Sequence, residues 1–541
     1  MIGTMQDWPL LLWKLIDYAA HNHGKRAVIS NTVEGGVLET NWAQVHRRSK
    51  QVAQALVASG IGAGDRVGTI AWNTHRHVEL WYGICGMGAV AHTLNPRLFP
   101  EQLVYIANHA GDRVLCFDLN LIKLVEGLAP HLRTVELYVC MTDRAHLPES
   151  HLPLIAYEDW IGAHDGEFAW AQLDENAPAG LCYTSGTTGD PKGVLYTHRS
   201  NMLHTLVGMS GDRSDGGQRG VIMPIVPMFH ANAWGVPYAT AAMGQSLVLN
   251  GAAFDPKTLH RLIHDYGVTS TAGVPTVWLG LLQYLDATGQ NLGPLKKLLI
   301  GGAAAPPSMI AAFEDRYGLE VMHSWGMTEM SPMGTLGALT AEVLALPLDE
   351  RRAEQAKQGR VPFGVEMKIV GADGAELPHD GHAFGSLLVR GPWIVQRYYG
   401  YEEAAVDAQG WFDTGDVATI DAMGYMNIVD RSKDVIKSGG EWISSIEVEN
   451  IAVGCPGVAE AAVIGIRHPK WDERPLLVIV RKPDAQVTRA DMLEYLTGKI
   501  AKWWMPDDVV FVDAIPHTAA GKIQKVALRQ QFAHYRLPTA A

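Results

Sequence analysis

The feature that most constrains the fold of this chain is a repeated alternation of strand-like segments with segments of helical spacing. Between residues 41 and 120, three helix-like segments, one of them expected to be buried, alternate with the strand-like RVGTIAWN (66–73) and RVLCFD (113–118). The same order recurs between Leu259 and Ile300. This alternation favours parallel strands, because a helical crossover is what joins one parallel strand to the next. The sequence therefore predicts an α/β fold with mostly parallel sheets flanked by helices.

A change in character near residue 430 indicates a second domain. The 541 residues exceed what one compact core usually holds. The polar segment DRSKDV is typical of a linker, and helical and strand-like segments follow it. We predict a large N-terminal domain over residues 1–429, a hinge linker over 430–435 and a small α+β C-terminal lid domain over 436–541. The alternative is that 430–435 is an ordinary surface turn within one domain.

Composition narrows the classes of partner and location. The chain carries a formal net charge of −13 with 47% hydrophobic residues, which is typical of a globular protein and disfavours nucleic acid as a partner. No apolar run approaches the ~20 residues of a transmembrane helix, and the N-terminal segment lacks the basic start of a signal peptide. Five widely spaced cysteines without a C-x-x-C pair favour a reducing compartment. We therefore expect a cytoplasmic protein in which Cys182 is a buried thiol.

The segment YTSGTTGDPKGV, Tyr183–Val194, indicates a phosphate-binding loop. Its glycines allow backbone N–H groups to approach an anion, its hydroxyls donate hydrogen bonds, and Lys192 adds a positive charge. The segment is not a nucleotide P-loop, because that pattern places Ser or Thr directly after the lysine, whereas Gly193 follows Lys192. Taken alone, the segment has an ordinary turn as its alternative interpretation.

Together with this loop, four later segments indicate a resemblance to a known family. They are SWGMTE (324–329), WFDTGD (411–416), DRSKDVIKSGGEW (430–442) and HTAAGKIQK (517–525). In this order the five motifs resemble those of the adenylate-forming superfamily, which includes acyl-CoA synthetases, peptide-synthetase adenylation domains and luciferases. Segments such as HTLNPRL, AGVPTVWL, KSGGEWISS and HPKWDERP extend the resemblance to bacterial medium- and long-chain fatty acyl-CoA synthetases over nearly the whole chain. The resemblance implies ligation of a fatty acid to coenzyme A through acyl-AMP, with ATP converted to AMP and pyrophosphate.

The resemblance also implies which residues bind ATP and Mg²⁺. Thr184 and Glu329 match the two protein contacts of Mg²⁺, a cation that prefers a few protein oxygens together with phosphate and water. Trp325 occupies the position of the aromatic residue that stacks on adenine, and Asp416, with Arg431 as its partner, matches the ribose-binding aspartate. For Trp325 a core position, and for Asp416 a turn-capping role, are the alternatives. The residues implied to bind ATP or AMP are Thr184, Ser185, Gly186, Thr187, Thr188, Gly189, Lys192, Gly302, Ala303, His323, Ser324, Trp325, Gly326, Thr328, Asp416, Arg431, Lys433 and Lys437.

The acyl site is implied by PMFHANAWG, residues 227–235. His230 resembles the residue beside the substrate carboxylate, where a histidine donates a hydrogen bond without a full charge. Trp234 resembles the tryptophan that gates the fatty-acid tunnel, and Ala231 lies between them. A core histidine is the alternative for His230. The resemblance does not indicate the length of the substrate's acyl chain, because related enzymes accept medium-chain acids or short thioether acids.

Lys522 resembles the catalytic lysine of the first half-reaction. When a carboxylate attacks the α-phosphate of ATP, a lysine that reaches both groups holds them in line and offsets the growing negative charge. Gly439, Gly440, Glu441 and Trp442 resemble the loop beside the coenzyme A channel. By resemblance, the small domain rotates about Lys433 between the half-reactions.

Two rival functions were weighed against this interpretation. An acyl-AMP ligase would deliver its product to a carrier protein, and a silent nucleotide- or acyl-binding protein would catalyse nothing. The coenzyme A-like loop disfavours the first, and the joint presence of Lys192, Glu329, Asp416 and Lys522 disfavours the second. The resemblance further implies a homodimer whose ligands are small molecules: a carboxylic acid, ATP and coenzyme A.

Overall fold

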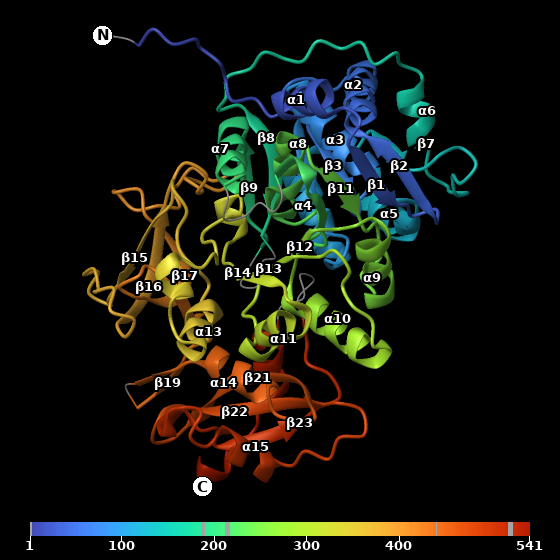
Figure 1. The fold of residues 1–541 in the computed structure, drawn as a ribbon. Helices are drawn as coiled ribbons and strands as arrows, with labels where there is room; N and C mark the ends of the chain where they lie inside the picture. Colours follow the sequence, from blue (N-terminus) through green and yellow to red (C-terminus); the bar gives the residue numbers. More distant parts are fainter. Residues whose placement is uncertain (1–2, 185–189, 211–216, 440, 518–522, 541) are drawn as a thin grey trace.

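The computed structural model describes residues 3–184, 190–210, 217–439, 441–517 and 523–540 (Figure 1). It confirms the predicted fold class, with a large N-terminal domain of mostly parallel sheets and helices and a smaller C-terminal domain, orange to red in Figure 1. Within the described ranges, no helix has both the length and the apolar character needed to cross a bilayer.

Two seven-stranded sheets form the framework of the N-terminal domain. The first has the order β7-β6-β5-β3-β4-β8-β9 and is parallel except for the β8–β9 hairpin. The second has the order β14-β13-β12-β10-β11-β1-β2 and is parallel except for β1–β2. The bounds in the first sheet are β3 Arg66–Ile70, β4 Val90–Thr93, β5 Asp112–Phe117, β6 Leu137–Cys140, β7 Leu154–Ala156, β8 Pro178–Tyr183 and β9 Gly193–Thr197. Those in the second are β1 Ala27–Asn31, β2 Val37–Asn41, β10 Val221–Pro224, β11 Ser246–Leu249, β12 Ser270–Gly273, β13 Lys297–Ile300 and β14 Glu320–His323.

The helices of this domain begin at caps that the sequence supplies. The side chains of Asn41, Thr74 and Asp255 each accept a hydrogen bond from a backbone N–H in the first turn of the helix that follows. Helix α3 is buried along its whole length, including the polar side chains of its first turn and a half, His75, Arg76, His77 and Glu79. The helices are α1 Trp13–His23, α2 Trp42–Ala58, α3 His75–Gly86, α4 Pro100–Ala110, α5 Ile122–Leu128, α6 Tyr157–Gly162, α7 His198–Gly208, α8 Val236–Met243, α9 Pro256–Asp265, α10 Pro275–Thr288, α11 Pro307–Tyr317, α12 Ala341–Leu344 and α13 Leu348–Ala356.

The N-terminal helix α1 belongs to the core of its own chain. Its residues Leu15, Ile16 and Ala19 are buried in the same cluster as residues of α2 and α3. The thiol of Cys182 is buried at the end of β8, as predicted, and burial raises its pKa.

A four-stranded antiparallel sheet, which the sequence interpretation did not identify, completes the N-terminal domain. It has the order β15-β16-β17-β18 and lies on the left in Figure 1. Its strands are β15 Glu366–Val370, β16 Phe384–Arg390, β17 Phe412–Ile420 and β18 Met426–Arg431. The sheet pairs Asp416 of β17 directly with Arg431 of β18, so two residues of separate motifs become neighbours.

The C-terminal domain is the expected α+β unit. Strands β20-β19-β22-β21 form its sheet, and β23 pairs with β22 in parallel. Its elements are β19 Ile436–Ser438, β20 Glu441–Ile443, α14 Ser445–Val453, β21 Val458–His468, β22 Asp472–Arg481, α15 Arg489–Leu496, β23 Asp508–Phe511 and α16 Lys525–Gln531. A turn separates β18 from β19, so the structure has a break in regular structure at the place where the linker is predicted. The domain limits at 429 and 436 stay predictions.

Polar contacts hold this domain against the end of β18. The carboxylate of Asp430 accepts a hydrogen bond of 2.8 Å from the backbone N–H of Ser445. The ammonium of Lys525 forms a 2.9 Å ion pair with Glu449 and also donates to the Ser445 hydroxyl. Burial opposes the charge of Lys525, but Glu449 and Asp430 raise its pKa, so this lysine stays protonated. The Asp430–Ser445 hydrogen bond therefore joins the small domain to the end of β18, whereas the Lys525 contacts lie within the small domain.

Candidate active site

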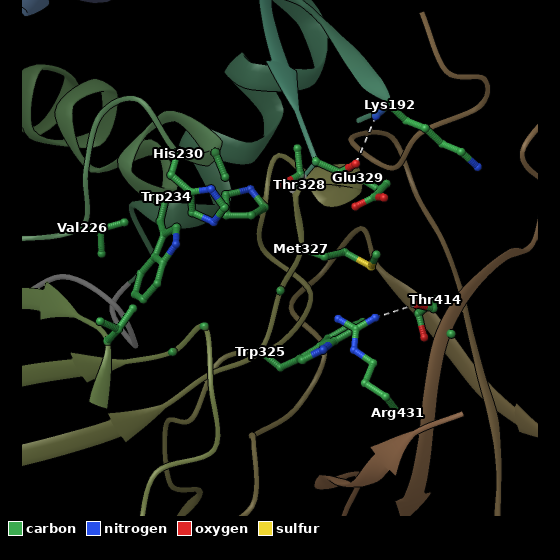
Figure 2. Close-up of a pocket in the computed structure, with 18 of the residues that line it drawn as sticks. Lys192, Val226, His230, Trp234, Trp325, Met327, Thr328, Glu329, Thr414 and Arg431 are labelled. Atoms are coloured by element: carbon green, nitrogen blue, oxygen red, sulfur yellow. Dashed lines mark hydrogen bonds between the residues drawn. The ribbon is translucent and has the colours of Figure 1, made fainter. Parts of the chain in front are cut away.

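A cavity of about 1230 Å³ lies where the large sheets, the antiparallel sheet and the C-terminal domain meet. Its walls include Ile225 and Gly301, which directly follow β10 and β13, so it opens at the carboxyl ends of parallel strands. That edge is where open α/β sheets bind ligands, since the connecting loops diverge there. Figure 2 shows His230 and Trp234 on one side of the cavity and Thr414 and Arg431 on the other.

One wall gathers the groups suited to phosphate and metal. Thr184 and Lys192 face each other across the base of the predicted phosphate loop: the Thr184 N–H donates to the Lys192 carbonyl at 2.9 Å, and the Thr184 hydroxyl accepts from the Lys192 N–H at 3.2 Å. Glu329 lies opposite in a short 3-10 helix, Thr328–Met330, with its side chain buried. The phenol of Tyr398 donates a 2.9 Å hydrogen bond to Glu329 Oε1. These residues all line the cavity.

The oxygen donors on this wall fit Mg²⁺. Glu329 offers a carboxylate and Thr184 a hydroxyl, both of which are hard ligands. No cluster of three or more His, Cys, Asp or Glu side chains occurs among residues whose positions the structure gives, so a cage made only of protein ligands is not formed there. Mg²⁺ does not need such a cage, because it retains water and takes phosphate oxygens as ligands.

A second wall holds Trp325 and Arg431, both of which contact the buried Asp416. The indole N–H of Trp325 donates to Asp416 Oδ2 at 3.1 Å, and Arg431 Nε pairs with Asp416 Oδ1 at 2.7 Å. The expected Arg431–Asp416 pairing is therefore present. Asp416 itself is only 2% exposed and lies behind the lining residues. The ring of Trp325 packs on Gly334, where an added Cβ would lie 2.4 Å from the indole. The structure thus leaves no room for a side chain beneath Trp325.

A third wall is apolar and contains the segment that carries His230 and Trp234. Residues Ala231 to Trp234 all have positive φ, between 43° and 56°, and Gly235 continues the left-handed turn at 71°. Such a conformation costs roughly 1–2 kcal/mol per non-glycine residue, and it occurs mainly where function requires it. The turn directs Trp234 toward Gly301 and Gly302, where an added Cβ would lie 3.1 Å and 3.7 Å from the indole.

Among the predicted site residues whose side chains the structure describes, most line this cavity. The lining residues among them are Thr184, Lys192, His230, Ala231, Trp234, Gly302, Ser324, Trp325, Gly326, Thr328, Glu329, Arg431 and Lys433. Ser185, Gly186, Thr187, Thr188, Gly189, Gly440 and Lys522 lie outside the described residues, as do the side chains of Glu441 and Trp442. The ligand contacts assigned to all of these residues stay predictions.

Several predicted residues lie away from the cavity. The ring of His323 is 1% exposed; its Nδ1 lies 2.9 Å from the Ala356 carbonyl, and its Nε2 accepts from the Ala305 N–H at 3.3 Å. Burial lowers the pKa of His323, which favours a neutral structural residue. Ala303 and Lys437 also do not line the cavity. In this orientation, direct ATP contacts by these three side chains are not supported.

Gly439, the first residue of the predicted coenzyme A loop, also does not line the cavity. The N–H of Gly439 donates to the Trp471 carbonyl at 2.8 Å within the C-terminal domain. By contrast, Lys433, Ile523 and Gln524 line the cavity. In the observed orientation, Ile523 and Gln524, which follow Lys522 in the sequence, line the cavity, whereas Gly439 does not.

The sequence interpretation assigned no role to several lining residues. Arg97 places its guanidinium 4.6 Å from the ring centroid of Phe254, and Tyr398 and Tyr401 surround the Lys192 ammonium. Arg529 pairs with Asp434 at 2.7 Å beside the turn that follows β18. Arg97 falls within HTLNPRL, one of the segments that carry the family resemblance. No local sequence pattern marks Tyr398 or Arg529 as a site residue.

Comparisons with known proteins agree with this geometry. The AMP-binding enzyme family matches residues 16–399, and the AMP-binding enzyme C-terminal domain family matches residues 447–522. The chain is 51% identical over 533 residues to a 3-methylmercaptopropionyl-CoA ligase of Ruegeria pomeroyi, a match that covers 98% of this chain and 99% of the relative. It is 45% identical over 533 residues to a medium-chain-fatty-acid–CoA ligase of Ectopseudomonas oleovorans, with 98% of both chains covered.

A solved structure extends the agreement to the whole fold. The anthranilate CoA ligase AuaEII, in complex with anthranoyl-AMP, superposes with a TM-score of 0.85 at 25% identity, covering 97% of this chain and 99% of that one.

Proposed function

We propose a substrate for this chain, which belongs to the AMP-binding enzyme family and is an AMP-forming acid–CoA ligase. Its acid is a linear fatty acid of medium to long chain. One observation carries the proposal: a continuous cavity joins the apolar wall at Trp234 to the charged wall at Lys192 and Glu329. An apolar tail and a triphosphate then meet in one space, with the carboxylate between them.

The residues of the cavity account for the first half-reaction. A fatty acid is already ionised at neutral pH, so no general base is needed. Its carboxylate oxygen attacks the α-phosphorus of ATP, the bond to the β-phosphate oxygen breaks, and pyrophosphate leaves with the electron pair. Lys192 and Lys522 offset the charge that builds on the phosphoryl oxygens, and His230 orients the carboxylate. Glu329 and Thr184 would hold Mg²⁺, which supplies further charge neutralisation.

The second half-reaction requires a different surface. The coenzyme A sulfur attacks the acyl carbon, the carbon–oxygen bond to AMP breaks, and AMP leaves as the thiol proton passes to solvent. Because Gly439 faces Trp471 and not the cavity, we propose that the small domain rotates about Lys433 before this step. A cytoplasmic homodimer stays a prediction.

A short thioether acid is the second candidate substrate. The contact of the Trp234 indole with Gly301 and Gly302 favours it, since that contact limits the depth of the apolar wall. The 51% identity to a ligase named for such an acid supports it equally. Thioester formation from a panel that includes 3-(methylthio)propionate and straight-chain acids of three to eighteen carbons separates the two. A maximum at six carbons or more supports the fatty acid, and a maximum at the thioether acid overturns it.

An acyl-AMP ligase that serves a carrier protein is distinguished by a simpler measurement. Turnover of acyl-AMP that depends on free coenzyme A supports the ligase proposed here. Pyrophosphate release without thioester formation, at saturating coenzyme A, would favour the carrier-dependent enzyme.

Replacing Trp234 with alanine should shift the preference toward longer acids. The change removes an apolar contact of ~2–3 kcal/mol with a short acid and opens space beside Gly301 and Gly302. We expect kcat/KM to fall for the shortest substrates and to change least for the longest, with the KM for ATP unchanged. Initial rates across the acid panel measure this.

The matched control is Trp8→Ala, because Trp8 is 58% exposed and does not line the cavity. If Trp234→Ala and Trp8→Ala give the same chain-length profile as the parent enzyme, Trp234 is a packing residue and not a gate.

A further inference from the structure

Tyr398 contacts both oppositely charged groups of the phosphate wall. Its hydroxyl donates a 2.9 Å hydrogen bond to Glu329 Oε1. The face of the same ring holds the Lys192 ammonium 4.8 Å from its centroid, and Tyr401 contributes a second ring at 6.0 Å. One side chain therefore contacts both charges, through chemically different parts.

The opposite charges of Lys192 and Glu329 favour their pairing with each other instead of with ligands. A lysine and a glutamate in one partly desolvated cavity attract each other strongly, and a direct ion pair would neutralise both. Lys192 would then offer less charge to phosphate, and Glu329 less to a cation. In the structure the Lys192 ammonium lies over the rings of Tyr398 and Tyr401.

We propose that Tyr398 is a positioning residue that keeps Glu329 and Lys192 apart. Its phenol hydroxyl orients the Glu329 carboxylate for Mg²⁺. Its ring face holds the Lys192 ammonium in place for the phosphates of ATP. The inference rests on the proposed role of Glu329 as a metal ligand. A phenol suits both tasks, because its O–H is a donor to a carboxylate and its π-face attracts a cation.

The backbone around Tyr398 supports this role. The N–H of Val395 donates to the Glu329 carbonyl at 2.8 Å, and the N–H of Tyr399 donates to the Gly193 carbonyl, also at 2.8 Å. The segment that carries Tyr398 is thus bonded to both segments that carry the charges.

The first test is Tyr398→Phe, which removes the hydroxyl and keeps the ring. We expect Mn²⁺, used as a probe for Mg²⁺, to bind about tenfold more weakly, because the carboxylate loses a charge-assisted hydrogen bond. The measurement is Mn²⁺ binding by electron paramagnetic resonance with α,β-methylene-ATP, where no turnover occurs. Binding within twofold of the parent enzyme would overturn the role of the hydroxyl.

The matched control is the neighbouring Tyr399→Phe. The Tyr399 hydroxyl donates to the Ala110 carbonyl at 3.3 Å, and this residue does not line the cavity. The control removes the same atom one residue away, and we expect unchanged Mn²⁺ binding. Equal weakening in both variants would show a general disturbance of the segment and would also overturn the proposal.

The ring is tested by Tyr398→Leu, alone and combined with Lys192→Met. We expect Tyr398→Leu to bind α,β-methylene-ATP without added metal several-fold more weakly than Tyr398→Phe, because Lys192 is then free to pair with Glu329. In the Lys192→Met background, this difference between leucine and phenylalanine should vanish. A difference that persists without the lysine would show that the ring acts only by packing.

Glu329→Gln separates failure of this inference from failure of the metal assignment. Unchanged Mn²⁺ binding in Glu329→Gln would show that Glu329 is not a metal ligand, and the premise would be wrong. Weakened binding in Glu329→Gln together with normal binding in Tyr398→Phe would overturn only the positioning role of Tyr398.

Discussion

Replacing Lys522 with alanine should slow acyl-AMP formation by about a thousandfold or more, while the reaction of pre-made acyl-AMP with coenzyme A proceeds at close to the normal rate. The loss is expected because the charge on the α-phosphate in the transition state is then less compensated. The lysine itself lies outside the described residues, but Ile523 and Gln524 next to it line the cavity. Acid-dependent pyrophosphate release measures the first step, and consumption of purified acyl-AMP measures the second.

Lys482→Ala is the control for this prediction, since Lys482 is an exposed lysine of the same domain that does not line the cavity. It should leave both half-reactions unchanged. If Lys522→Ala slows both half-reactions equally while its melting temperature stays normal, Lys522 is not specific to the first step and the assignment is wrong.

Replacing Lys433 with proline should leave acyl-AMP formation within about tenfold of normal and slow thioester formation by about a hundredfold or more. The N–H groups of Asp434 and Val435 both donate to the Arg431 carbonyl in the observed turn, at 2.8 and 2.9 Å. Proline fits the φ of a turn but disfavours a helical conformation at Ser432 before it, which explains the moderate loss in the first step. Its fixed φ would prevent the rotation that the second step requires.

Single-turnover experiments measure both effects, first as acyl-AMP accumulation and then as its decay after coenzyme A is added. Lys433→Ala is the matched control, because it removes the ammonium and keeps the backbone free to rotate. Normal decay in a well-folded proline variant would place the hinge elsewhere. Slow decay in both variants would assign the effect to the lysine side chain and not to rotation.

Several regular elements of the two mostly parallel sheets were predicted from the sequence. The strand-like 66–73 and 113–118 correspond to β3 and β5, and the alternation between Leu259 and Ile300 corresponds to the run from α9 to β13. Such elements are predictable because both faces of a parallel sheet are covered, so their strands show as short apolar runs between amphipathic helices. The α+β character of the last 110 or so residues followed from the same kind of pattern.

The antiparallel sheet β15–β18 was not identified, for a physical reason. Its strands are partly exposed and interrupted by glycine-rich turns, and a register shift between Val417 and Ala418 breaks the pairing of β17 with β18. Exposed antiparallel strands carry a weaker hydrophobic signal than buried parallel ones. This sheet nevertheless brings Asp416 beside Arg431, two residues that the resemblance assigns to the ribose site.

The sequence by itself determined the family, the reaction class and the motif residues that meet at the cavity, because a phosphate site requires particular residue types within short, continuous segments. Only the tertiary structure decided which of those motif residues face the cavity, since it buried His323 and turned Gly439 away. It also placed Tyr398, which no motif marks, against both Lys192 and Glu329. The physical reason is that contacts between residues 192, 329 and 398 depend on how separate sheets pack, and a local pattern of residues holds no record of that packing.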